Sequence, residues 1–176
     1  MGPSTERPII PAARALSVPL AGLQAGMLAA LWMLAWMGST SVWQRRSFWT
    51  PENLLATAFY RHAALSDRFS GQTLSGLALY LLIYSSLGLI FATVVRLRLH
   101  PGRLVVVGIL AGLGWYFLSF HLLWKAANPL IPLLHAERPT LLGHVLYGAM
   151  VARFPRHVAY SPGPATIPEA LVSHDS

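Results

Sequence analysis

The sequence contains no cysteine and few charged residues. Zero cysteines among 176 residues exclude disulfides, thiolate metal sites, c-type haem attachment and cysteine nucleophiles. Only 11% of the residues are charged, whereas a soluble domain usually carries about 25%. The hydrophobic share is 55% and the mean hydropathy is +0.52. This composition excludes a soluble enzyme domain, a disordered protein and a free DNA-binding module, and it indicates a small integral membrane protein.

The charges that are present lie at the edges of long apolar runs. Three long intervals contain no charged residue: Arg14 to Arg45, Arg68 to Arg96, and Arg103 to Lys125. A shorter uncharged interval lies between Arg138 and Arg153. A charge at the centre of a bilayer costs about 2.5–3.5 kcal/mol, so this spacing is typical of membrane helices. The net charge of +7 is therefore distributed around helix ends and does not form a nucleic-acid-binding stripe.

These runs predict an all-α, membrane-embedded four-helix bundle. The expected spans are about residues 19–38, 73–95, 104–124 and 139–154. The first three have the roughly 20 residues that a ~30 Å hydrocarbon core requires, whereas the fourth is short. Either Arg153 extends its guanidinium to the headgroups, or residues 128–134 re-enter the membrane. That stretch contains two prolines, so it is not expected to form a regular span. We expect flexible tails at 1–15 and 158–176, around a membrane domain at 16–157.

The first run is interpreted as a retained anchor. Its apolar stretch, Leu16–Met37, is well beyond the roughly 7–15 residues of a cleaved signal peptide. With four spans, both termini lie on one side of the membrane. The numbers of basic residues on the two sides are nearly equal, so the total count does not decide which side is cytoplasmic. The short loop Leu97–Gly102 lies beside Arg96 and Arg103, and short basic loops resist translocation. We therefore expect both termini to be cytoplasmic.

The loop between the first two spans carries a helix signal. Thr50-Pro51-Glu52 offers an N-cap residue, a proline at the first helical position and an acid in the first turn. We expect an interfacial helix over about 51–62, with Glu52 and Asn53 on the side away from its apolar face. Four residues are candidates for contact with lipid headgroups, either as a specific lipid site or as ordinary anchors: Trp43, Arg45, Arg46 and Trp49.

Small residues at four-residue spacing predict close helix packing. The first span has Gly22 and Gly26, and the third has Gly108 and Gly112. We expect these faces to pack inside the bundle, with a homodimer seam as the alternative. Gln24 is expected to hydrogen-bond across a helix interface, because an unpaired amide in hydrocarbon costs several kcal/mol.

Histidine is the residue type that could carry chemistry. His121, near the end of the third span, and His144, in the fourth, are expected at similar depth near one membrane face. Two such histidines could ligate a b-type haem or a metal, or relay a proton; the alternative is that they form ordinary structural hydrogen bonds. His62 and His135 could join them. No Asp or Glu is expected inside the membrane, which argues against a carboxylate-driven relay.

The last third of the chain resembles small bacterial inner-membrane proteins of unknown role. Its segment Leu141–Met150 contains a His-x-x-Tyr-Gly pattern, and Gly112–Trp124 contains Gly-x-Gly-Trp-Tyr. The resemblance implies a four-span protein of a bacterial inner membrane and transfers no activity.

The function that these observations favour is a non-enzymatic accessory or scaffold subunit without catalytic residues. Its expected partners are membrane lipids, another membrane protein or a second copy, and no nucleic acid; no cofactor is expected beyond the haem alternative. One alternative is an electron-transfer or proton-handling subunit that uses His121 and His144. Another is a lipid or small-solute carrier with a polar cavity lined by Gln24, Tyr84, Ser85 and Ser119.

Overall fold

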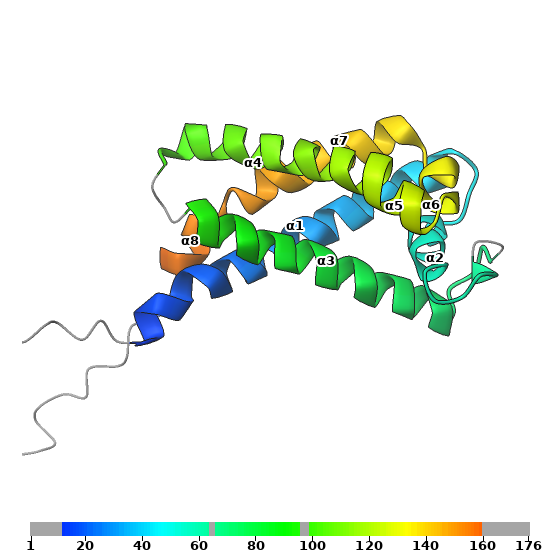
Figure 1. Cartoon of the computed structure of the whole chain (residues 1–176), viewed down its shortest axis with the longest axis horizontal. Coiled ribbons are helices and arrows are strands. Elements are labelled where there is room, and N and C mark those ends of the chain that lie inside the picture. The colour runs from blue at the N-terminus through cyan, green and yellow to red at the C-terminus, as the bar shows by residue number, and fades with distance from the viewer. Residues whose placement is uncertain (1–11, 64–65, 96–98, 160–176) are drawn as a thin grey trace, which may run out of the picture.

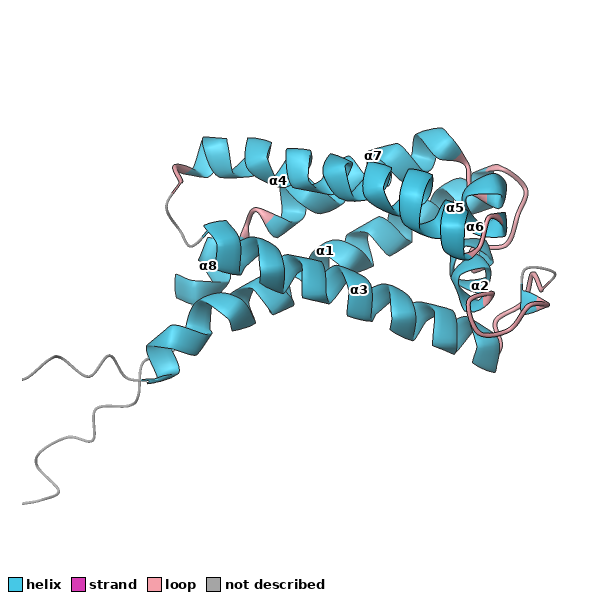
Figure 2. Ribbon diagram, viewed as in Figure 1, coloured by secondary structure: helices cyan, strands magenta, loops and turns pink. Residues whose placement is uncertain are grey.

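The computed structural model describes residues 12–63, 66–95 and 99–159, and its elements within these ranges are all helices (Figures 1 and 2). Three helical segments are long and apolar enough to cross a membrane: Leu16–Trp43, Gly71–Val95 and Pro101–Ala127. The described part of the chain is therefore all-helical, and its three long apolar helices indicate a membrane protein. Most of the two expected tails lies outside the described residues, but residues 12–15 and 158–159 are helical.

The three long helices follow the uncharged runs closely. Helix α1 (Ala12–Trp43) extends beyond the expected first span at both ends and keeps Pro19 inside the helix. Helix α3 (Gly71–Val95) begins two residues before the expected second span and ends with it. The third span is one helical rod in three parts: α4 (Pro101–Phe117), a π-helical segment η2 (Leu118–Leu123) and α5 (Trp124–Ala127).

The fourth expected span is divided between two helices. Helix α7 (Glu137–Val151) has 15 residues, so it is about 22 Å long. A turn follows, and α8 (Phe154–Ala159) then packs against α1. The stretch that was considered as a re-entrant segment contains α6 (Leu130–Leu134). This helix has five residues and lies next to the end of α5. As expected, residues 128–134 do not form a regular span.

The long helices pack in the order α3, α1, α7, α4 (Figure 1). Helix α1 meets α3 through glycine, because a Cβ added to Gly88 would lie 2.5 Å from the Gly22 carbonyl oxygen and 2.5 Å from the Gly26 Cα. Real Cβ atoms do not approach backbone atoms so closely, so only glycine permits this contact. The small-residue face expected on the first span therefore packs inside the chain.

Helices α4 and α7 meet in the same way. A Cβ on Gly148 would lie 2.8 Å from the Ile109 Cα and against the Gly108 backbone. A Cβ on Gly112 would meet the His144 carbonyl oxygen. Between the described residues of α3 and α4 there is almost no contact. The bundle is therefore closed through α1 and α7, and it is open along one side between α3 and α4.

The loop helix differs from its prediction in length and orientation. Helix α2 spans Thr50–Ala56, shorter than the expected 51–62. Glu52 and Asn53 are each 1% exposed and Thr57 is 6% exposed, so the polar side predicted to face outward is buried. The reason is that α2 packs on α3 and caps one end of the bundle, where polar groups find protein partners.

Asn53 shows how this polar side is accommodated. Its Nδ2 donates to the carbonyl oxygens of Ser66 at 2.8 Å and Arg68 at 3.3 Å, and its Oδ1 accepts a hydrogen bond from the Thr73 hydroxyl at 2.6 Å. One buried amide thus ties the loop before α3 to both α2 and α3, which fixes the end of the bundle where the candidate site lies.

Candidate functional site

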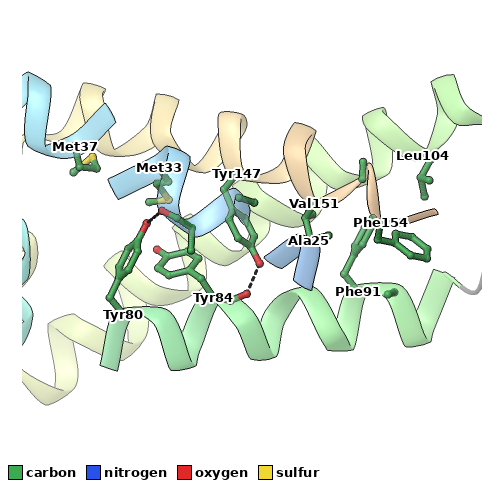
Figure 3. Close-up of a cluster of buried hydrophobic side chains, with 14 residues drawn as sticks. Ala25, Met33, Met37, Tyr80, Tyr84, Phe91, Leu104, Tyr147, Val151 and Phe154 are labelled. Carbon is green, nitrogen blue, oxygen red and sulfur yellow. Dashed lines mark hydrogen bonds between the residues drawn. The ribbon is translucent and has the colours of Figure 1, made fainter. Parts of the chain in front are cut away.

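His144 lies fully buried on α7, and both of its ring nitrogens have partners. Nδ1 lies 2.8 Å from the Thr140 carbonyl oxygen and Nε2 lies 2.9 Å from the Tyr84 hydroxyl. A carbonyl can only accept, so Nδ1 carries the proton, and Nε2 of the neutral ring accepts from Tyr84. Tyr147 then donates to the Tyr84 carbonyl oxygen at 2.6 Å (Figure 3). These bonds link α3 to α7 across the interior of the bundle.

We expect Tyr84→Phe to destabilise the protein by about 1–2 kcal/mol, because it removes the donor to a buried His144 nitrogen and leaves that nitrogen unpaired. Reversible unfolding in mixed micelles, followed by circular dichroism, measures the change. Tyr60→Phe is the matched control, since Tyr60 is 43% exposed; an equal loss in both variants would contradict the role given to the Tyr84 hydroxyl.

His121 does not face His144. It is exposed on the outer side of η2, where its ring stacks on Phe117 with centroids 5.5 Å apart. The Tyr116 ring contacts both imidazoles, with centroids 5.8 Å from His121 and 5.3 Å from His144. An aromatic side chain therefore lies where a flat macrocycle would need space. Within the described ranges, no three His, Asp or Glu side chains are grouped so that they could hold a metal ion.

Glu52 is the residue that the sequence interpretation missed. The sequence placed Glu52 on the outer side of the loop helix, whereas α2 carries this carboxyl group into the end of the bundle. Among the described residues, Oε2 of Glu52 is the buried side-chain polar atom without a hydrogen-bond partner. Burial raises the pKa of Glu52 from 4.5 to about 7, against the opposing effect of a hydrogen bond from its own backbone. Such a group changes its charge near neutral pH.

The Glu52 carboxyl faces a small cavity between α2, α3, α5 and α7. We call this space of about 30 Å³ the inner cavity. Its titratable lining groups are Glu52, Tyr80, His135 and His144. Tyr80 donates its hydroxyl proton to the Ala30 carbonyl oxygen at 2.9 Å. The volume and the polar lining suit one or two water molecules, and a larger solute does not fit.

His135 lies between the inner cavity and the surface. It lines the inner cavity and also a shallower pocket, the outer pocket, whose polar lining includes Gln44 and Arg46. Its Nδ1 donates to the Ile131 carbonyl oxygen at 2.9 Å, so its Nε2 can accept a proton. Burial lowers the pKa of His135 from 6.5 to about 4, and the nearby charge of Arg46 lowers it further, against the hydrogen bond to Ile131. The imidazole is therefore neutral at pH 7.

The polar cluster occupies only one end of the bundle. Toward the other end, the buried side chains are apolar: Phe91, Leu104, Val151 and Phe154 (Figure 3). The rings of Phe91 and Phe154 pack edge to face, with centroids 6.1 Å apart. Among the described residues, these side chains offer no polar group to continue a chain of hydrogen bonds, so the inner cavity communicates with one end alone.

The four predicted headgroup residues have different surroundings. Trp43 is 87% exposed and Arg45, with φ of 61°, is also exposed, so both can contact lipid. Arg46 instead donates to the Leu134 carbonyl oxygen at 2.9 Å. Trp49 packs on Phe48 and on Phe69, with centroids 5.0 and 4.8 Å away. Arg46 and Trp49 thus help to hold the loop against the bundle.

The residues proposed for a carrier cavity do not form one polar surface. Gln24 is exposed on α1, so the expected hydrogen bond across a helix interface is wrong. Ser119 donates to the Tyr116 carbonyl oxygen at 3.2 Å, the Tyr84 hydroxyl is used by His144, and Ser85 is only partly buried.

The sequence did contain a signal for Glu52. It is the acid of a short Thr-Pro-Glu-Asn-Leu-Leu segment between two long spans, where a carboxyl group can be placed against the protein interior. Comparisons with protein-family models, with curated proteins and with solved structures find no match to this chain. The site is therefore interpreted from its own residues.

Proposed function

We propose that this chain is a four-span bacterial inner-membrane protein that binds and releases a proton at Glu52 from one side of the membrane. The observation that carries the proposal is the buried Glu52 carboxyl group, whose Oε2 lacks a partner and which lines the inner cavity with His135 and His144. This is the proton-handling alternative with Glu52 and His135 as its central groups in place of His121.

The placement of α7 supports a fourth span. It lies between α1 and α4 and packs closely on both (Figure 1). Its 15 residues cross a locally thinned core, or one whose boundary the exposed Arg153 reaches with its long side chain. With cytoplasmic termini, as the short basic loop between α3 and α4 favours, the polar end of the bundle faces the periplasm.

His135 supplies the route for the proton. It lines both the outer pocket and the inner cavity, and its neutral Nε2 can accept a proton from water and pass it to Glu52. The groups that face Glu52 are Tyr80 from α3 and His135 and His144 from the α7 side. None of them carries a fixed positive charge that would keep Glu52 ionised. Since the far half of the bundle is apolar, the proposed role is a response to external pH, and conduction across the membrane is not part of it.

An infrared titration of the protein in lipid nanodiscs tests the proposal. Wild-type protein is expected to lose a protonated-carboxyl C=O band as the pH rises through about 7, where the Glu52 pKa lies. Glu52→Gln is expected to abolish that change. Glu137→Gln is the matched control because Glu137 is exposed, and it should leave the band unchanged.

Two outcomes would contradict the proposal. In the first, the C=O band of Glu52 titrates near pH 4.5, or Glu52→Gln changes no band. The carboxyl group would then have a structural role, which favours the accessory or scaffold function. A proton flux into liposomes that Glu52→Gln blocks would contradict the one-sided site.

A further inference from the structure

An apolar groove runs between α3 and α4, far from the Glu52 site. Its volume is about 290 Å³. Its walls are Leu87, Ile90, Phe91, Val94 and Val95 from α3, and Val107, Gly108, Ala111, Gly112 and Trp115 from α4. Tyr147 and Val151 of α7 form its floor, and the Tyr147 hydroxyl is already donated to the Tyr84 carbonyl oxygen. The groove therefore offers an apolar ligand a surface whose side chains are apolar apart from the Trp115 indole and the Tyr147 hydroxyl.

The groove follows from the way in which the bundle packs. Gly88 of α3 faces α1, and Gly108 and Gly112 of α4 face α7, so the two helices that border the groove approach other partners and not each other. Both are among the long apolar helices, which places the groove at the depth of the hydrocarbon.

Two kinds of apolar occupant could cover the groove: a hydrocarbon chain, or a helix from a second copy or from a partner protein. A narrow hydrocarbon chain suits its volume and its chemistry. The charged residues at its mouth favour a lipid, because a lipid combines a hydrocarbon chain with a charged headgroup.

The mouth of the groove carries positive charge. Arg103 precedes Val107 and Ala111 at four-residue spacing, so it lies on the same face of α4, one turn nearer the helix start. Arg103, Arg153 and Arg156 are all exposed, and they lie at the end of the bundle where α4 begins and α7 ends (Figure 1). Among the described residues, the acids Glu52, Asp67 and Glu137 all belong to the opposite end.

We propose that the groove between α3 and α4 binds an anionic phospholipid, with an acyl chain along the groove and the phosphate at Arg103. Arginine presents a planar fork of donors that matches phosphate oxygens. Basic sites between membrane helices on the cytoplasmic side are suited to anionic headgroups. This site differs from the headgroup contacts expected at Trp43 and Arg45, which lie at the other end of the bundle.

Native mass spectrometry of the full chain in detergent, titrated with phosphatidylglycerol or phosphatidylcholine, tests this proposal. We expect tighter binding of phosphatidylglycerol. Arg103→Gln should weaken its binding about five-fold, because one arginine near a lipid surface contributes roughly that factor. It should weaken phosphatidylcholine binding less, because the choline charge offsets that of the phosphate. Arg61→Gln, at the opposite end, is the charge control.

A second pair of variants tests the groove itself. Ala111→Phe fills the space between α3 and α4, so it should weaken the binding of both lipids. Leu110→Phe adds a comparable ring to a neighbouring side chain that is 61% exposed and does not line the groove, so it should have no effect. Should Ala111→Phe fail to fold, Val94→Phe fills the same groove from α3, where Val94 is 75% exposed.

Equal lipid binding by Ala111→Phe and by its control Leu110→Phe would overturn the proposal. So would equal affinity of the wild-type protein for the two lipids, because the basic residues would then not select a headgroup with net negative charge. Dimers that disappear on Ala111→Phe while lipid binding stays constant would assign the groove to a second copy.

Discussion

Gly148→Leu is expected to destabilise the bundle by about 3 kcal/mol or more, which is the upper part of the usual cost of overpacking. The added side chain would meet the Gly108 backbone and the Ile109 Cα, and neither can move without separating α4 from α7. Unfolding in mixed micelles, followed by circular dichroism, measures the loss.

Gly114→Leu is the matched control for this prediction. A Cβ on Gly114 would meet no atom within 4 Å, although Gly114 lies on α4, the same helix that contacts Gly148. We expect this variant to lose no stability and to gain up to about 1 kcal/mol, because leucine favours the helix over glycine. A similar loss in both variants would show that glycine flexibility, and not the close contact between α4 and α7, determines stability.

Glu52→Gln is expected to change the pH dependence of stability. Burial raises the pKa of Glu52 from 4.5 to about 7, so between these values the folded protein holds a proton that the unfolded chain has lost. The contribution of Glu52 to stability therefore falls as the pH rises from 4.5 to 7, by about 3 kcal/mol at 1.36 kcal/mol per pKa unit. Glutamine does not ionise, so this fall disappears in the variant.

His135 contributes with the opposite sign. Burial lowers its pKa from 6.5 to about 4, so between these values the unfolded chain holds the extra proton and stability rises with pH. In the wild type these two contributions oppose each other between about pH 4.5 and 6.5. Relative to the wild type, Glu52→Gln should therefore make stability rise more steeply with pH, and His135→Asn should make it rise less or fall.

Unfolding measured at pH steps from 4 to 8 checks both slopes. His62→Asn serves as the control because His62 is exposed. A Glu52→Gln protein whose stability still falls between pH 4.5 and 7 would contradict the raised Glu52 pKa. A His135→Asn protein with the same pH dependence of stability as the wild type would contradict the burial of a neutral His135.

The long helices were predictable because charged residues are excluded from the hydrocarbon core, so a long uncharged run indicates a membrane helix. Helix α3 ends at Val95, as expected, because Arg96 begins the next charged stretch. The glycine pairs predicted close packing because Gly22 and Gly108 leave room for a neighbouring backbone. Spacing alone does not say which helix fills that room, so the pairings of α1 with α3 and of α4 with α7 became known only from the structure.

The candidate site was less predictable, because an amphipathic pattern defines two faces without saying what covers each. The polar face of α2 was assigned to the outside, as it would be on a helix at the surface of a bilayer. At the end of a bundle, however, Glu52 and Asn53 find cavity and backbone partners inside the protein. The same ambiguity affected the histidines: His121 shares a face with Phe117 as expected, but that face points outward, while His144 points inward.

The π-helical segment η2 gives the third span one surplus residue compared with a regular helix. Each residue turns an α-helix by about 100°, and the wider π turn absorbs that rotation, so the residues that follow keep their direction, including Trp124 in the wall of the inner cavity. If all six residues from Leu118 to Leu123 wound as a regular α-helix instead, Trp124 would rotate away from Glu52. The environment of the buried acid therefore depends on the winding of this segment as well as on the identity of its side chains.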